Sequence, residues 1–286
     1  MPEKKFNTIL VPIDGSVSCL RARELALLIA KKFNSKITVV HVVSHDFMHP
    51  ELKANYQLPP EVSQKMDEVY IKAGEKILRG AEETFKEEGL QVESILIRRA
   101  EDPADSILNL SKERSFDLVI MGNRAETHAE RFDLGSTSEK ISLYSQTPVI
   151  ITKKKTKLAK ILVAIDGSKQ ANKALGYTSI LAKKFNSKVT LLHVAEAKLA
   201  SLEPEEVRRI SENILWDSAT EMEGVSIDKR LEYGKPAEVI IKLASEENYD
   251  LIVLGSRGLS SIKRYLLGSV SEDVVWYAKR SVLIVR

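Results

Sequence analysis

Short apolar runs alternate along the chain with longer segments in which apolar residues recur every three or four positions. The run Thr8 to Ile13 predicts a buried strand. The spacing of Ala22, Leu25 and Ile29 predicts a helix over residues 17–33. The same reasoning predicts, in order, a strand at 37–43, a helix at 61–88, a strand at 91–98, a helix at 103–113, a strand at 117–121, a helix after residue 135 and a strand at 148–152.

The second half of the chain repeats the first. The segment Ile9 to Ser16 returns at residues 161–168 with one substitution, and Ala30 to Lys36 returns unchanged at 182–188. Both segments recur after 152 positions. The run Asp117 to Gly122 recurs after only 133 positions, so the second copy is shorter by 19 residues.

Two copies are too few for a solenoid, which needs about three or more repeats, so we predict a tandem pair of domains. The first domain covers residues 1–152 and the second covers 159–286. The lysine-rich segment 153–158 is too polar to join either core, and we expect it to be a solvated linker. We expect the 19 residues that the second copy lacks to come from a loop of the first copy, His45 to Pro60.

The alternation of strands and helices sets the predicted fold class. Strands that are joined by helices form parallel sheets with right-handed crossovers, so each half should be a doubly wound α/β domain with five strands. In such sheets, ligands bind at the carboxyl ends of the strands, where the winding direction switches. Asp14, Asp166 and two glycine-containing loops fall at these strand ends.

Composition excludes several classes of protein. The chain has 286 residues, of which 43% are hydrophobic and 29% are charged, and no apolar run reaches the length of a membrane span. The N-terminal residues do not resemble a signal peptide, so we expect a soluble, cytoplasmic protein without a membrane partner. A net charge of +3, without basic stripes interleaved with aromatic residues, does not indicate a nucleic-acid partner. The single cysteine, Cys19, excludes a disulfide framework.

A phosphate-binding loop is predicted after the apolar run Leu251 to Leu254. Gly255 and Gly258 allow a tight turn and allow an anion to approach the backbone amides. After nine further residues, Gly268 and Ser269 begin a helical pattern whose first amides would point at the same place. The alternative is an ordinary glycine-rich loop in which Ser269 caps a helix.

These glycines resemble the G-2x-G-9x-G-[S/T] nucleotide signature of the universal stress protein family. The resemblance covers essentially the whole chain as a tandem pair of Rossmann-like domains of the adenine nucleotide alpha hydrolase-like type. It implies ATP or AMP as the ligand. It also implies that two domains pair through their last strands, here 148–152 and 282–285. A homodimer through other faces stays open.

The resemblance assigns site residues in both copies. In the second copy, residues at the phosphates and the ribose would be Gly255, Arg257, Gly258, Gly268, Ser269, Val270 and Ser271, and residues at the adenine and ribose end would be Ala164, Asp166 and Val194. The first-copy counterparts are Pro12, Asp14, Val42, Gly122, Arg124, Gly135, Ser136, Thr137 and Ser138.

The roles of the aspartates and the histidines have alternatives. Asp14 and Asp166 could bind ribose hydroxyls, and Asp166 could hold a Mg²⁺ ion, or both could start a turn and cap the next helix. His41 and His193 end the second strand of each copy, where we expect a buried or ligand-lining histidine rather than a catalytic one.

The two glycine loops differ in charge. In the first copy Ala125 replaces the second glycine, and the nine residues before Gly135 carry a net charge of −2. The nine residues before Gly268 carry +2. Because a unit interaction at 4 Å is worth roughly 1 to 4 kcal/mol, we expect the second copy to be the stronger ATP site.

Three classes of function stay open at this point. The first is a nucleotide-binding regulatory module of the stress response. The second is a slow ATP hydrolase or nucleotidyl-transfer enzyme, and the third is a dimerisation scaffold that binds no nucleotide. The sequence has no G-x-x-x-x-G-K-[ST] motif and neither loop offers an obvious general base, so we name no catalytic residues.

Overall fold

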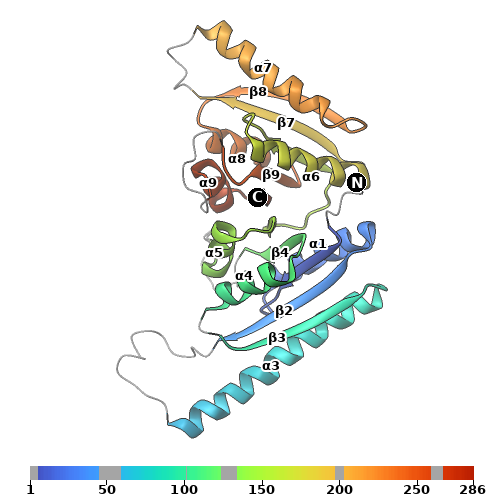
Figure 1. The fold of residues 1–286 in the computed structure, drawn as a ribbon, viewed down its shortest axis with the longest axis vertical. Helices are drawn as coiled ribbons and strands as arrows, with labels where there is room; N and C mark the ends of the chain where they lie inside the picture. The colour runs from blue at the N-terminus through green and yellow to red at the C-terminus, as the bar shows by residue number, and fades with distance from the viewer. Residues whose placement is uncertain (1–5, 45–58, 101, 124–133, 197–202, 259–266) are drawn as a thin grey trace.

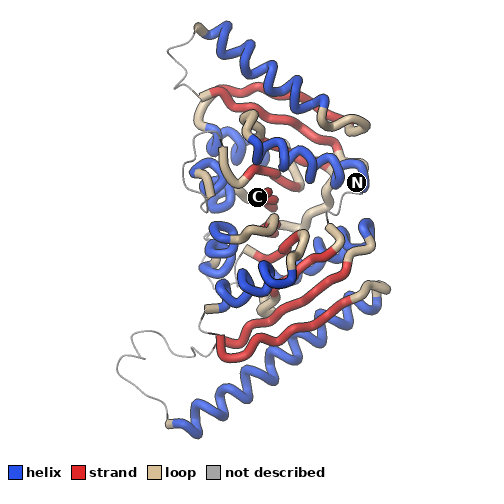
Figure 2. Tube along the Cα trace, viewed as in Figure 1, coloured by secondary structure: helices blue, strands red, loops and turns tan. Residues whose placement is uncertain are grey.

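The structure is a computed structural model that describes residues 6–44, 59–100, 102–123, 134–196, 203–258 and 267–286. Its centre is a sheet of ten strands in the order β3-β2-β1-β4-β5-β10-β9-β6-β7-β8. The first five strands come from the first half of the chain and the last five from the second half, and helices cover both faces (Figure 1, Figure 2).

The elements follow the predicted order in both halves. The first half contains β1 (Thr8–Pro12), α1 (Val17–Phe33), β2 (Lys36–Ser44), α3 (Pro60–Glu87), β3 (Val92–Ala100), α4 (Pro103–Arg114), β4 (Leu118–Gly122), α5 (Ser136–Tyr144) and β5 (Val149–Thr152). The second half contains β6 (Lys160–Ala164), α6 (Lys169–Phe185), β7 (Lys188–Ala195), α7 (Pro204–Thr220), β8 (Ser226–Tyr233), α8 (Pro236–Glu246), β9 (Leu251–Gly255), α9 (Ser269–Tyr277) and β10 (Ser281–Val285).

Each half is a doubly wound parallel sheet, as the alternation of elements predicted. β1 pairs in parallel with β2 on one side and with β4 on the other. Alternate strand residues enter opposite cores: Ile9 packs with α1 and α3, whereas Leu10 packs with α4 and α5. The same division places α6 and α7 on one face of the second half and α8 and α9 on the other.

The two halves join through their last strands, which confirms the predicted pairing. β10 pairs antiparallel with β5, and Ile150 lies opposite Leu283 at the centre of the register. Every residue of both strands is buried. This one pairing converts two five-stranded sheets into a continuous sheet, so the geometry of each half relative to the other is set by backbone hydrogen bonds.

The length difference between the copies was assigned correctly only in part. α3 has 28 residues and α7 has 17, so the helices alone account for 11 of the 19 residues. The rest arises mainly between β2 and α3, where residues 45–58 lie outside the described part of the chain. A helix can gain three turns without disturbing the sheet because the added turns extend past the strands (Figure 1). No helix in the described ranges, α3 included, is both long enough and apolar enough to cross a membrane.

The linker is also less solvated than its composition suggested. Lys153 is only 8% exposed, and Thr156 and Leu158 are buried as well. The Lys153 ammonium donates hydrogen bonds to the carbonyl oxygens of Val275 and Trp276 in the second half. The segment therefore belongs to the junction between the halves, and the prediction of a solvated joint holds only for the exposed Lys154, Lys155 and Lys157.

The first testable consequence concerns the junction. Leu283→Ala removes a fully buried side chain at the strand pairing, and we expect it to lower the free energy of unfolding by about 2 to 5 kcal/mol. Val69→Ala on α3 removes a side chain that is 64% exposed and should change the free energy of unfolding by less than about 0.5 kcal/mol. Urea unfolding followed by circular dichroism measures both values. Similar midpoints for the two variants would contradict the role given to this pairing.

A second consequence concerns pH. Burial lowers the pKa of Lys153 to about 8, whereas the unfolded chain keeps this proton up to an ordinary pKa of 10.5. The unfolded state therefore binds more protons between these values, and stability rises with pH across this window. Between about pH 7.5 and about pH 9.5, the free energy of unfolding of the wild type should rise by about 1 to 2 kcal/mol relative to that of Lys153→Met. A difference that does not change with pH in urea titrations would disprove this account.

Candidate functional site

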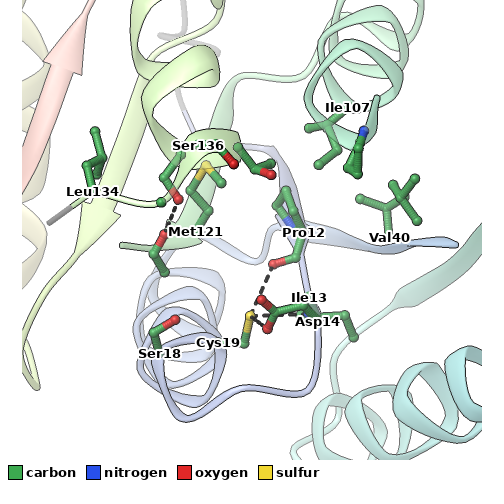
Figure 3. Close-up of a pocket in the computed structure, with 16 residues that line it drawn as sticks. Pro12, Ile13, Asp14, Ser18, Cys19, Val40, Ile107, Met121, Leu134 and Ser136 are labelled. Carbon is green, nitrogen blue, oxygen red and sulfur yellow. Dashed lines mark hydrogen bonds between the residues drawn. The ribbon is translucent and has the colours of Figure 1, made fainter. Parts of the chain in front are cut away.

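A cavity opens where the winding of the first half switches direction. β1 and β4 are neighbours, but their crossover helices lie on opposite faces of the sheet, so a gap forms at their carboxyl ends. The cavity there has a volume of about 570 Å³ (Figure 3). It is lined by Pro12, Ile13, Asp14, Ser18, Cys19, Val40, Val42, Pro103, Ile107, Met121, Gly122, Leu134, Gly135, Ser136, Thr137 and Ser138.

This lining contains every first-copy residue that the sequence assigned to a nucleotide site and that the structure describes. Arg124 and Ala125 lie outside the described residues. The sequence reasoning missed several apolar residues of the lining, among them Ile107 and Met121. Their signal was available, because Met121 directly precedes the first glycine and Ile107 lies one helical turn from the proline that begins α4.

Asp14 starts a tight turn at the end of β1. Its Oδ1 atom accepts a hydrogen bond of 2.9 Å from the Ser16 amide, and the turn passes through Gly15 at a φ of +83°. Asp166 repeats this contact with the Ser168 amide at 2.9 Å. The helix caps are the serines themselves, since Ser16 accepts from the amide of Cys19 and Ser168 from the amide of Ala171. The aspartates therefore start the turn but do not cap the helix.

Cys19 distinguishes the first site from the second. Its thiol donates a hydrogen bond of 2.8 Å to Asp14 Oδ1, and the two side chains point toward each other in Figure 3. Burial, together with the charge of Asp14, raises the pKa of Cys19 to about 12, so the thiol stays protonated. Burial would raise the pKa of Asp14, but hydrogen bonds from Cys19 and Ser16 outweigh it and lower this pKa. The second copy has Ala171 at the position of Cys19.

The two histidines have structural roles. His41 Nδ1 lies 2.7 Å from the carbonyl oxygen of Ile13, and His193 Nδ1 lies 2.9 Å from that of Ile165. Each ring thus joins the end of the second strand to the turn that follows the first strand. Of the two outcomes that the sequence left open, the buried histidine is the one observed for His193, which is 9% exposed.

Close approach, rather than an unusual turn, explains the glycines at 122, 255 and 258. The φ angle is not positive at Gly122, Gly255, Gly258 or Gly268. A Cβ atom on Gly255 would lie 2.7 Å from the backbone carbon of Gln170 in α6. A Cβ atom on Gly258 would lie 2.4 Å from Asp166 Oδ2. The first glycine therefore lets helix α6 pack on the strand end, and the second lets the loop pack on the aspartate.

The helices that follow the loops have open N-termini. Gly135 and Gly268 are the N-caps of α5 and α9, and neither has a side chain that could accept from the first-turn amides. These amides are the donors that an anion would satisfy, and the helix dipole favours negative charge at this end. Ser136 and Ser269, the first helical residues, are both exposed.

Ser138 and Ser271 hold these helices in place. The Ser138 hydroxyl donates to the carbonyl oxygen of Gly122 at 2.8 Å, and the Ser271 hydroxyl donates to that of Gly255 at 2.8 Å. Each of these hydrogen bonds fixes a helix N-terminus against the end of the neighbouring strand.

The second-copy residues lie at equivalent places. Ala164 ends β6 beside Leu192, and Val194 lies near the end of β7, half-buried like Val42 in the first copy. Arg257 and Val270 are half-buried on either side of the segment 259–266, which lies outside the described residues. The sequence reasoning also missed Ser256, which is fully buried and whose hydroxyl finds no hydrogen-bond partner within the described ranges.

The described residues offer few clustered side chains that could bind a metal ion. Within the described part of the chain, three or more histidine, cysteine, aspartate or glutamate side chains do not gather into a group that could hold a metal. A Mg²⁺ ion at Asp166 would therefore need most of its ligands from phosphate oxygens and water, which is how Mg²⁺ commonly binds beside nucleotides.

Fold and site together define a tandem pair of doubly wound α/β domains with a loop-and-helix cavity at the switch point of the sheet. The family model for the universal stress protein family matches twice, at residues 5–153 and 157–286. The chain belongs to the universal stress protein family.

Several proteins are similar to all or part of this chain. The universal stress protein YxiE of Bacillus subtilis is 33% identical over 150 residues, which cover 52% of this chain and 99% of that protein. A universal stress protein of Archaeoglobus fulgidus has the same fold over 98% of both chains, with a TM-score of 0.72 and 24% identity. One half also resembles a universal stress protein solved in complex with cAMP, with 27% identity over 44% of this chain and 96% of that chain and a TM-score of 0.39.

The close approach at Gly255 gives a direct prediction. Gly255→Ala forces a methyl group against the backbone of α6, and we expect a loss of about 1 to 3 kcal/mol in the free energy of unfolding. Gly80→Ala is the matched control because nothing lies within 4 Å of its added Cβ, and in a helix it should stabilise by about 0.5 to 1 kcal/mol. Thermal unfolding of the two variants should shift in opposite directions. Equal shifts would show that packing at Gly255 is not the constraint.

Proposed function

We propose that this chain binds adenine nucleotides at both of its glycine loops and acts as a nucleotide-dependent regulatory module of the stress response. The observation that supports this most directly is the cavity of about 570 Å³, which lies at the uncapped N-terminus of α5. Its lining includes all of the described first-copy residues that the sequence assigned to a nucleotide.

The lining divides the proposed ligand into a charged end and an apolar end. The first-turn amides at Ser136 and Thr137 would receive the phosphates, because they have no side-chain acceptor from their own N-cap. Val40 and Ile107 offer an apolar wall for the base at the other side of the cavity. Asp14, whose lowered pKa keeps it ionised at neutral pH, would accept hydrogen bonds from ribose hydroxyls.

The second site would use the same parts with a different charge. Asp166 Oδ1 accepts from the Ser168 amide, and Oδ2 faces Gly258. In the proposal, this oxygen would approach a phosphate-bound Mg²⁺ ion or a ribose hydroxyl. The nine residues before Gly268 carry +2, against −2 before Gly135, so a triphosphate would be favoured in the second half. A tenfold preference requires only about 1.4 kcal/mol, which is within reach of a difference of four charges at a screened surface.

Titration of the full chain with ATP tests the site and the ranking together. We expect two sites, of which the tighter one is weakened at least about tenfold by Gly258→Ala. The added methyl group would displace the Asp166 carboxylate, which is the far end of a short side chain, so the fold should survive. Gly80→Ala is the control for the same substitution at a place without neighbours. Isothermal titration calorimetry measures the affinities.

Each alternative result has a distinct meaning. If the wild type binds no adenine nucleotide, the proposed function is wrong. Binding that Gly258→Ala leaves unchanged would disprove the role of the second glycine loop, and two sites of equal affinity would disprove the ranking.

A further inference from the structure

Helices α5 and α9 lack the terminal partners that α1, α4 and α6 supply for themselves. Each has nine residues, begins after a glycine without a side-chain cap, and has no basic residue in its last turn. By contrast, α1 begins at the Ser16 cap and carries Lys31 and Lys32 in its last turn. The last carbonyl groups of a helix need donors, and a cation is favoured there.

The missing cations come from the opposite half of the molecule. Lys153, which follows β5 of the first half, donates to the carbonyl oxygens of Val275 and Trp276 in the last turn of α9, the latter at 3.1 Å. Arg286, which follows β10 of the second half, donates to the carbonyl oxygen of Ser142 in α5. Lys153 and Arg286 are 133 positions apart, the offset that relates the ends of the two copies, so the two contacts are equivalent.

Both cations are themselves held by the first helix of their own half. Arg21 of α1 donates to the main-chain oxygen of Lys153 at 3.2 Å. Lys173 of α6 donates to that of Arg286 at 3.3 Å. Figure 1 places α5 and α9 on the two sides of the junction between the halves. Each helix therefore faces a proposed phosphate site at its N-terminus and a cation from the other half at its C-terminus.

Stability alone does not account for these cations. Burial lowers the pKa of Lys153 to about 8, and burial with the nearby charge of Arg257 lowers that of Arg286 to about 10. Both groups remain charged at neutral pH, but the cost of burying the charge offsets much of the benefit of the hydrogen bonds. A positional role is consistent with this balance, because the donors fix where the end of a nine-residue helix lies.

We propose that Lys153 and Arg286 are positioning residues for the nucleotide site of the opposite half. Each holds the C-terminus of the helix whose N-terminal amides form the phosphate end of that site. The inference rests on the proposed nucleotide sites for its functional part and on the crossed contacts for its structural part. One half therefore sets the affinity of the other.

Hydrogen exchange of the full chain, read by mass spectrometry, tests the structural part. Lys153→Met should speed exchange about tenfold in the last turn of α9 and leave exchange in α5 unchanged. A tenfold change is the size expected when a partly buried cation at a helix C-terminus is removed. Arg286→Met should do the reverse. Lys154→Met is the matched control, since Lys154 is the exposed neighbour of Lys153, and Lys153→Arg should restore slow exchange in α9.

ATP titration of the same proteins tests the functional part. Lys153→Met should weaken the same site that Gly258→Ala weakens and leave the other site unchanged. The affinity comparison uses Lys153 only, because Arg286 also lies near Arg257 of the second site.

The outcomes separate the two proposals. Exchange that changes in neither helix, in both helices equally, or in the helix of the same half would overturn the crossed arrangement. Crossed exchange with unchanged ATP affinities would overturn the positioning role. If the wild type binds no ATP but the exchange is crossed, the proposed function fails while the structural part stands.

Discussion

The antiparallel pairing of β5 with β10 is the constraint on which the rest of the molecule depends. It buries the last strand of each half completely and leaves each of them at the centre of a ten-stranded sheet rather than at an edge. Apolar edge strands invite association, and here the two copies cover each other. Because the pairing fixes the residues that follow each strand, it also brings Lys153 and Arg286 to the helices of the opposite half.

The same pairing relates the two sites to each other. Each proposed nucleotide site lies at the carboxyl ends of strands, and each has a short helix whose C-terminus contacts a cation of the other half. Ser138 and Ser271 attach these helices to the strands at one end, and the crossed cations attach them at the other. The sites differ where their chemistry can differ, at Cys19 against Ala171 and in the charge of the glycine loops. A tandem arrangement keeps this asymmetry within one chain.

Much of this fold could be predicted from the sequence, because periodicity, repeats and glycine spacing are local signals. The helix over 17–33 was predicted at its observed bounds, and the pairing of the last strands followed from a family resemblance. Features that depend on distant packing could not be predicted. The burial of Lys153 requires α9, and the need for Gly255 arises from the backbone of Gln170, neither of which is visible in a local pattern. The part of the length difference that lies in the longer helix α3 was assigned to a loop, because a helical pattern gives no information on where a repeat has lost residues.

The most direct test of the central claim is to identify what travels with the protein. The full chain is purified gently, without added nucleotide, and acid releases any bound small molecule for chromatography. The account predicts that adenine nucleotide is released, and that its amount falls when the protein is dialysed against high salt, because the proposed contacts are with phosphates. A protein that releases no nucleotide and also binds none on titration would contradict the account and would leave a paired scaffold as the function of the fold.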